Sequence, residues 1–306
     1  MKKLMLGVAL AVMTSATAHA ETLGASFSLF DDVWLTGLRH GMQNYAQTLD
    51  KVNISFEDAQ GDVSRQQNHV QNYVATGVDG IIVMLVDPSS GPALSKIAAS
   101  AGVPLVFVNN APLNLDRLPE KQAFVGSDDY EAGTLQAEAV CKMLGGKGKA
   151  MVMVGQLGTT GALSRTKAVH DVFSRDECKG IKIVEEQTAN YMRTPAIDLM
   201  TNWLSAGREF DAVVANNDEM AVGAIQALKA SGRSMESVVI AGVDATPDAL
   251  NAVAAGGLDI TVYQNAKGQG KGAIDSVLKL SKGEAVEKKT YVPFELVTKD
   301  NLAQYR

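Results

Sequence analysis

Polar side chains able to do chemistry gather directly after apolar, strand-like segments of this chain. The segment Val213–Leu228, VVANNDEMAVGAIQAL, begins as an apolar strand and continues as an amphipathic helix, with Asn216, Asn217, Asp218 and Glu219 between the two. Amides both donate and accept hydrogen bonds, whereas carboxylates only accept them. The cluster could therefore serve catalysis or hold a polar ligand.

Similar polar clusters follow the other predicted strands. Ligands of open parallel sheets bind outside the carboxyl ends of the strands, so we expect these clusters to form one polar ring. They occupy Ser28–Trp34, Met84–Ser90, Asn109–Asn110, Ser127–Asp129, Gln156–Arg165, Asn190–Arg193, Asn216–Glu219, Asp244–Thr246 and Gln264–Asn265.

The residue types in this ring lack an activated nucleophile and a metal-binding pattern. The sequence contains no Gly-x-Ser-x-Gly, no Walker A pattern and no His/Cys cluster with the spacing of metal ligands. His40, His69 and His170 fall within predicted helices, away from the strand ends. We therefore expect neither a metal nor an organic cofactor.

A glycine-rich turn, in MVMVGQLGTTG, follows one strand and opens a helix. Its glycines, Gly155, Gly158 and Gly161, are spaced Gly-x-x-Gly-x-x-Gly, and no acid is suitably placed to bind a ribose. The turn therefore does not favour a dinucleotide site. It predicts a tight turn that lets the backbone approach a ligand.

A polyol suits such a ring, because each of its hydroxyl groups both donates and accepts hydrogen bonds. Carboxylates accept from hydroxyls, and an arginine donates as a fork. Phe30, Trp34 and Tyr191 lie at strand ends, where they could cover the C–H faces of a sugar ring. The alternative for Trp34 is a place in a helix core.

The elements that position this ring alternate between strand and helix. Nine apolar strands, from TLGASFSL to DITVYQ, are separated by helical segments such as Trp34–Leu49, Arg65–Thr76 and Glu131–Leu144. Apolar strands joined by helices indicate parallel sheets covered on both faces. The pattern predicts an α/β fold of two doubly wound parallel-sheet lobes.

The boundary between the lobes is expected at FVGSDDYEAG, where the short strand Ala123–Gly126 ends and a helix begins near Asp129. A second crossing near Gln264 and a third near Pro293 would return the chain between the lobes. The expected units are residues 1–20 as a signal peptide, 21–127 plus 265–292 as the N-terminal lobe, and 128–264 plus 293–306 as the C-terminal lobe.

The first twenty residues have the pattern of a secretory signal. Lys2 and Lys3 precede the apolar run LMLGVALAVM, and Ala18–Ala20 is a small-x-small cleavage site. We expect a periplasmic mature chain beginning at Glu21. Without the two lysines, 26 basic residues face 34 acidic ones, which argues against a nucleic-acid partner.

Cys141 and Cys178 are the two cysteines of the chain, each near the end of a predicted helix. In an oxidising compartment two cysteines of one domain often pair. A disulfide is one expectation, and one buried plus one exposed thiol is the other.

The motifs NNDEMAVGAIQAL, AGVDATPDAL and GSDDYEAG resemble those of the ribose-binding-protein-like family of periplasmic sugar-binding proteins. The resemblance extends from Thr22 to Val297. It implies two lobes joined by three crossing strands that close on a sugar, after which the closed form docks on the membrane permease of an ABC importer. It also implies a monomer, with a chemoreceptor as a further candidate partner.

The resemblance assigns roles to individual positions. In the second lobe it makes Arg165 a fork onto ring or hydroxyl oxygens and Tyr191 a stacking aromatic, and it expects Asp218 and Glu219 to cap the helix that they begin. Hydrogen bonds to the sugar are implied for Asn217, Asp244 and Gln264; Ser28, Asp32 and Trp34 would contact it from the first lobe, with Ser127 at the hinge.

Several positions depart from the ribose binders of that family. Asn109 and Asn110 stand where those proteins have an Asp-Arg pair, and Asp31 and Asp32 replace an amide pair. The departures put simple ribose in doubt. Inositol, amino-inositol or hexose ligands are favoured instead, with Asn109 and Asn110 among the contacts.

Two other functional classes compete with a receptor. An exported carbohydrate-active enzyme could use Asp32 and Asp244 as a pair of acids across a cleft. A ligand-sensing regulator of the LacI type shares the expected fold, but its N-terminal DNA-binding helices are replaced here by the signal-like segment.

Overall fold

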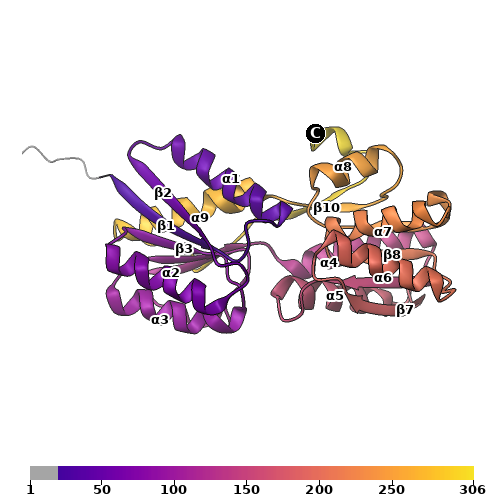
Figure 1. Ribbon diagram of the computed structural model, residues 1–306, viewed down its shortest axis with the longest axis horizontal. Helices are drawn as coiled ribbons and strands as arrows, with labels where there is room; N and C mark the ends of the chain where they lie inside the picture. Colours follow the sequence, from indigo (N-terminus) through magenta and orange to yellow (C-terminus); the bar gives the residue numbers. More distant parts are fainter. Residues whose placement is uncertain (1–19) are drawn as a thin grey trace, which may run out of the picture.

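The computed structural model describes residues 20–306, so the predicted signal peptide lies outside the described residues except for Ala20. Figure 1 shows two lobes side by side, joined by thin connecting segments. The fold is the predicted α/β fold with two lobes built on parallel sheets.

The first lobe contains a six-stranded parallel sheet in the order β11-β5-β4-β3-β1-β2. Helices α1 and α9 cover one face of this sheet, and α2 and α3 cover the other. The bounds are β1 Glu21–Phe27, α1 Val33–Gln47, β2 Val52–Asp58, α2 Val63–Thr76, β3 Gly80–Val83, α3 Gly91–Ala101, β4 Leu105–Val108, β5 Gln122–Gly126, α9 Ala266–Ser281 and β11 Lys289–Tyr291, with short 3-10 turns at Pro88–Ser90 and Leu115–Arg117.

The second lobe contains a four-stranded parallel sheet in the order β7-β6-β8-β9 and an antiparallel pair, β10 with β12. Helices α4 and α5 pack on one face of the sheet, and α6, α7 and α8 pack on the other. The bounds are α4 Asp129–Leu144, β6 Lys147–Val154, α5 Thr160–Phe173, β7 Gly180–Thr188, α6 Arg193–Ser205, β8 Ala212–Ala215, α7 Asp218–Ala230, β9 Val239–Ala241, α8 Pro247–Ala254, β10 Thr261–Gln264 and β12 Phe294–Val297, with 3-10 turns at Met235–Ser237 and Leu302–Gln304.

Burial on both sheet faces explains why the central strands are apolar throughout. All four residues of β3 and of β8, GIIV and AVVA, are buried. A half-exposed sheet would instead alternate apolar and polar residues. The three helices predicted from sequence periodicity agree with α1, α2 and α4 to within two residues at each end.

Three short links connect the lobes: residues 127–128 between β5 and α4, Asn265 between β10 and α9, and residues 292–293 between β11 and β12. Sheet membership is compatible with lobes of residues 21–127 plus 265–292 and 128–264 plus 293–306, and we keep this division as our proposal.

Cys141 in α4 and Cys178, which follows α5, are joined by a disulfide of 1.98 Å. The bond connects the end of α4 to the turn before β7, on the sheet face away from α6 and α7. It belongs entirely to the second lobe and leaves the links between the lobes unconstrained.

Candidate functional site

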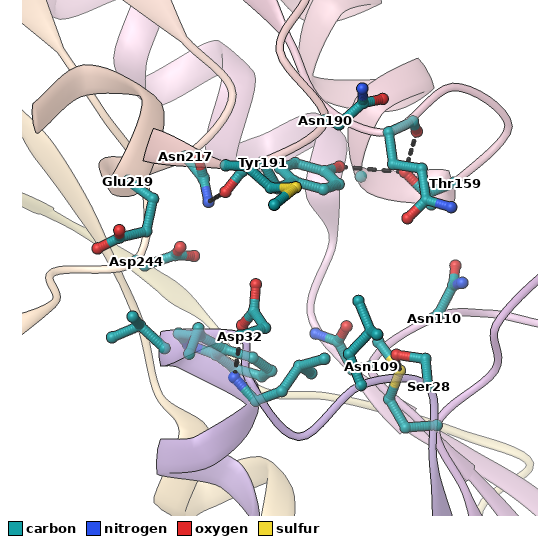
Figure 2. A pocket seen from close by; sticks show the side chains of 18 of the residues that line it. Ser28, Asp32, Asn109, Asn110, Thr159, Asn190, Tyr191, Asn217, Glu219 and Asp244 are labelled. Atoms are coloured by element: carbon teal, nitrogen blue, oxygen red, sulfur yellow. Dashed lines mark hydrogen bonds between the residues drawn. The ribbon is translucent and has the colours of Figure 1, made fainter. Parts of the chain in front are cut away.

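A cavity of about 700 Å³ opens between the two lobes at the carboxyl ends of the strands. Figure 2 shows polar side chains entering it from both lobes. Ten of the eleven candidate ligand residues line it: Ser28, Asp32, Trp34, Asn109 and Asn110 from the first lobe, and Arg165, Tyr191, Asn217, Asp244 and Gln264 from the second.

Ser127, the eleventh candidate, is not among the residues that line the cavity. Its hydroxyl accepts a hydrogen bond of 2.8 Å from Nε2 of Gln269 in α9, and the side chain is buried. The structure therefore places Ser127 in the link between the lobes.

On the first-lobe wall, Asp32 caps helix α1 and also faces the cavity. Its Oδ1 accepts a hydrogen bond of 2.8 Å from the backbone N–H of Leu35, and burial raises the pKa of its carboxyl group above the usual value. Trp34 is 9% exposed and donates its indole N–H to the carbonyl oxygen of Gln264 at 3.0 Å. Trp34 thus belongs to the helix core and also lines the cavity, and its contact with a sugar ring stays a prediction.

Arg165 organises the second-lobe wall. Its Nε and Nη2 donate to Oδ1 of Asp129 at 3.0 and 2.8 Å, and its Nη1 donates to the carbonyl oxygen of Asn216 at 2.7 Å. A further bond of 3.2 Å reaches Oε1 of Gln264. Burial opposes the charge, but Asp129 and other nearby acidic groups hold the pKa of the guanidinium above its usual value. Four of its five donors are therefore engaged within the protein.

Asp244 follows β9 in a backbone conformation that non-glycine residues rarely adopt, with φ of +125°. Oδ1 lies 4.0 Å from Arg165, and within residues 20–306 no hydrogen bond to its carboxylate is found. Burial, together with the carboxylates of Asp218, Asp32 and Asp129, raises the pKa of Asp244 well above the usual value, against the opposing effect of Arg165. Its acceptors face the cavity (Figure 2).

Tyr191 lies against the glycine-rich turn after β6. A Cβ atom added to Gly155 would lie 2.1 Å from the Tyr191 ring, and one added to Gly161 would lie 2.8 Å from its hydroxyl. That hydroxyl is 3.1 Å from Oγ1 of Thr159 (Figure 2). Gly155 and Gly161 therefore make room for Tyr191, and Gly161 also lines the cavity. That the turn lets the backbone approach a ligand stays a prediction.

Neighbouring residues of the strand-to-helix turn after β8 have different structural roles. Asn217 caps α7 by accepting from the N–H of Met220 at 3.1 Å, and its Nδ2 donates to the carbonyl oxygen of Tyr191 at 3.1 Å. Asn217 reaches the cavity with much of its hydrogen-bonding capacity already used.

Asp218 does not cap α7 as expected. Its buried carboxylate accepts from the N–H of Thr246 at 2.8 Å and from the hydroxyl of Thr261 at 2.7 Å, so it holds the loop that carries Asp244. Burial raises the pKa of Asp218 to about 7. Glu219 instead forms an ion pair of 2.7 Å with Arg193.

The cavity also contains residues that were not named as ligand candidates. Almost all of them belong to the strand-end segments that the sequence singled out; Leu35 and Gly61 are the two outside those segments. The polar ones are Asp31, Asp129, Gln156, Thr159, Thr160, Asn190, Arg193 and Glu219.

Carboxylates outnumber basic groups on the cavity wall by five to two. Arg165 pairs with Asp129, and Arg193 pairs with Glu219. Asp31, Asp32 and Asp244 are left, which gives the wall a surplus of three formal negative charges.

No group of three or more His, Cys, Asp or Glu side chains in residues 20–306 could hold a metal ion. Over the same residues, no helix has the length and hydropathy needed to cross a bilayer. None of the three histidines in the described helices lines the cavity.

Comparison with known proteins shows the family to which the chain belongs. A family model described as periplasmic binding protein domain matches residues 23–285. The chain is 62% identical over 306 residues to a putative rhizopine-binding protein of Rhizobium meliloti, covering 100% of this chain and 99% of that protein. It is 29% identical to the ribose import binding protein of Escherichia coli, over 95% of this chain and 96% of the relative.

Among solved structures, an ABC transporter solute-binding protein of Bacillus halodurans with bound myo-inositol superimposes with a TM-score of 0.88. The two chains are 38% identical, and the match covers 95% of this chain and 99% of that one. All three are named as binding proteins, the second of an import system and the third of an ABC transporter.

Proposed function

The chain belongs to the periplasmic binding protein family, in its ribose-binding-protein-like branch, and from this premise we propose that it is the solute receptor of an ABC importer. Its ligand is a monosaccharide or cyclitol held between the lobes. The proposed location is the periplasm, and the proposed partner is the membrane permease, with a chemoreceptor as a second candidate partner.

One observation carries the proposal: strand ends of both lobes deliver carboxylates, amides, hydroxyls and a guanidinium to a single cavity. Hydroxyl groups of a polyol can donate to the carboxylates and accept from the N–H groups. Trp34 and Tyr191 add aromatic surface for the C–H groups of a ring. Because the ligand touches both lobes only when they are close together, binding favours the closed state.

Inositol-like ligands, amine-bearing cyclitols and hexoses are favoured over ribose. The relative named for rhizopine and the structure with bound myo-inositol support the cyclitol class. The carboxylate surplus supports a ligand with a protonated amine, because an ammonium group compensates buried charge that a hydroxyl group leaves in place. We propose that Asp32 and Asp244 contact that amine from opposite lobes.

A thermal-shift screen tests this function. The protein is first unfolded and refolded to remove any ligand carried from the cell, and is then mixed with myo-inositol, scyllo-inosamine, glucose, galactose and ribose. A ligand at a hundred times its dissociation constant raises the free energy of unfolding by about 2.7 kcal/mol. We expect the largest shift with a cyclitol. Silence across the panel, or turnover of a glycoside by the purified protein, would contradict the proposal.

A further inference from the structure

Side-chain hydrogen bonds between the lobes occur at two places in residues 20–306. One is the bond from Trp34 to Gln264, which lies at the hinge strand β10. The other joins Asn110, after β4 of the first lobe, to Thr160 in the second. Oδ1 of Asn110 accepts from the Thr160 hydroxyl at 3.0 Å and from its N–H at 3.4 Å. Neither Asn110 nor Thr160 belongs to one of the three links between the lobes, so a change in the angle between the lobes changes the distance between these two residues.

The Thr160 N–H is one of the groups that a helix leaves without an internal partner. Thr160 is the first residue of α5, and the first N–H groups of an α-helix have no carbonyl within the helix to bond. Thr159, the N-cap, accepts from Ala162 and leaves the N–H of Thr160 free. Asn110 therefore supplies, from the opposite lobe, an acceptor that α5 itself lacks.

Asn110 is held rigidly in place for this contact. It is 5% exposed, and its Nδ2 donates to the carbonyl oxygen of Leu85 at 3.1 Å. The preceding Asn109 has φ of +63°, a conformation that asparagine tolerates better than most residues. This bend gives the side chain of Asn110 a fixed direction toward α5.

The capacity of Asn110 for other partners is small. Its carboxamide oxygen offers two lone pairs, and both are directed to Thr160. Of its two N–H groups, one is donated to Leu85. A single N–H group is left for a ligand, although Asn110 was expected to be a ligand contact.

We propose that the pair Asn110–Thr160 is a latch between the lobes that stabilises the closed state whether or not a ligand is present. The proposal rests on the proposed function in one respect, namely that ligand binds the closed form. The apparent affinity of a protein whose competent state is partly populated falls with that fraction. The latch therefore sets the affinity for every ligand by the same factor and leaves the choice among ligands to the other residues.

Small-angle scattering of the stripped, ligand-free protein tests the latch directly. We expect a larger radius of gyration for Asn110→Ala and for Thr160→Val than for the wild type, because both favour the open state. Asn72→Ala on α2 and Thr201→Val on α6 are matched controls, since both side chains are exposed and lie outside the cavity. Equal radii of gyration in the wild type and the two latch variants would overturn the proposal.

Calorimetric titration with myo-inositol and with scyllo-inosamine gives a second readout. Asn110→Ala removes both hydrogen bonds and should raise both dissociation constants by the same factor of about ten. Thr160→Val removes only the hydroxyl bond and should raise both dissociation constants by about threefold. If the two dissociation constants rise by unequal factors, Asn110 contacts the ligand directly, and this result also overturns the latch. If neither compound binds the wild type, the proposed ligand class fails, while the scattering of the ligand-free protein still decides the latch.

Discussion

The two walls of the cavity differ in how completely they are assembled. On the second-lobe wall, Arg165 and Asp129 form a closed network, and three lining residues other than glycine have positive φ angles: Asn190, Tyr191 and Asp244. On the first-lobe wall, Asn109 is the one such residue, beside the glycine Gly61. Uncommon backbone conformations persist where the surrounding structure enforces them, often at functional sites. The difference indicates that the second lobe is the preformed half of the site, onto which the first lobe closes.

Replacing Arg165 should have the largest effect, because this residue holds the second-lobe wall together. Arg165→Ala leaves Asp129 and Asp244 buried without a cation, and removing one partner of a buried ion pair costs about 3–5 kcal/mol. We expect urea unfolding to show a loss of this size and calorimetry to show no measurable binding of myo-inositol. Arg65→Ala, at an exposed position on α2 of the first lobe, is the control. Binding retained within tenfold in Arg165→Ala would refute the central role of this network.

Neutralising one carboxylate from each wall tests whether the two walls contribute unequally to binding. Asp244→Asn removes the buried carboxylate of the preformed wall. Asp32→Asn removes a carboxylate whose Oδ1 already accepts a hydrogen bond from the backbone N–H of Leu35 at the start of α1. For scyllo-inosamine we expect a rise in the dissociation constant of about a hundredfold for Asp244→Asn and about tenfold for Asp32→Asn, as for charge-assisted hydrogen bonds.

The control for these variants is Asp50→Asn, an exposed aspartate beyond the far end of α1 with the same change in charge. Scyllo-inositol, the neutral counterpart, should lose much less affinity than scyllo-inosamine. Equal losses for the two ligands would mean that the carboxylates accept hydrogen bonds from hydroxyl groups and that neither carboxylate pairs with the amine.

The pH dependence of stability should differ in sign between two carboxylates, Asp218 of the second lobe and Asp62 of the first. Burial raises the pKa of Asp218 to about 7, so the stability that Asp218 contributes is present below its unfolded-state pKa of about 4 and is lost as the pH rises through about 7. Backbone hydrogen bonds from Arg65 and Ser64 lower the pKa of Asp62, so its contribution is present at neutral pH and is lost in acid.

Urea unfolding of Asp218→Asn and Asp62→Asn at pH 3, 5 and 7.5 checks these signs. Relative to the wild type, Asp218→Asn should gain stability as the pH rises, and Asp62→Asn should lose it. Parallel curves for wild type and Asp218→Asn would contradict the shift, because they would show that the pKa of Asp218 is the same in the folded and the unfolded state.

The sequence located the site better than it assigned the roles within it. Strand ends could be predicted because apolar runs and helical periodicity mark them, and nearly every cavity residue lies in one of those segments. The role of each side chain depends on tertiary contacts with residues distant in the sequence, and neighbouring positions in the sequence do not reveal these contacts. Asp218 begins α7 in the sequence, yet its carboxylate holds the loop of Asp244 across the lobe. The direction of Asn110 depends on the positive φ of Asn109, which no sequence period encodes.

Calorimetric titration of the stripped wild-type protein with scyllo-inosamine, myo-inositol and ribose tests whether the cavity binds cyclitols. We expect one binding site per chain for the cyclitols, with scyllo-inosamine the tightest and ribose the weakest of the three ligands. Saturation by ribose without binding of either cyclitol would contradict the proposed ligand class, because the carboxylate-rich wall would then bind a neutral sugar and no amine.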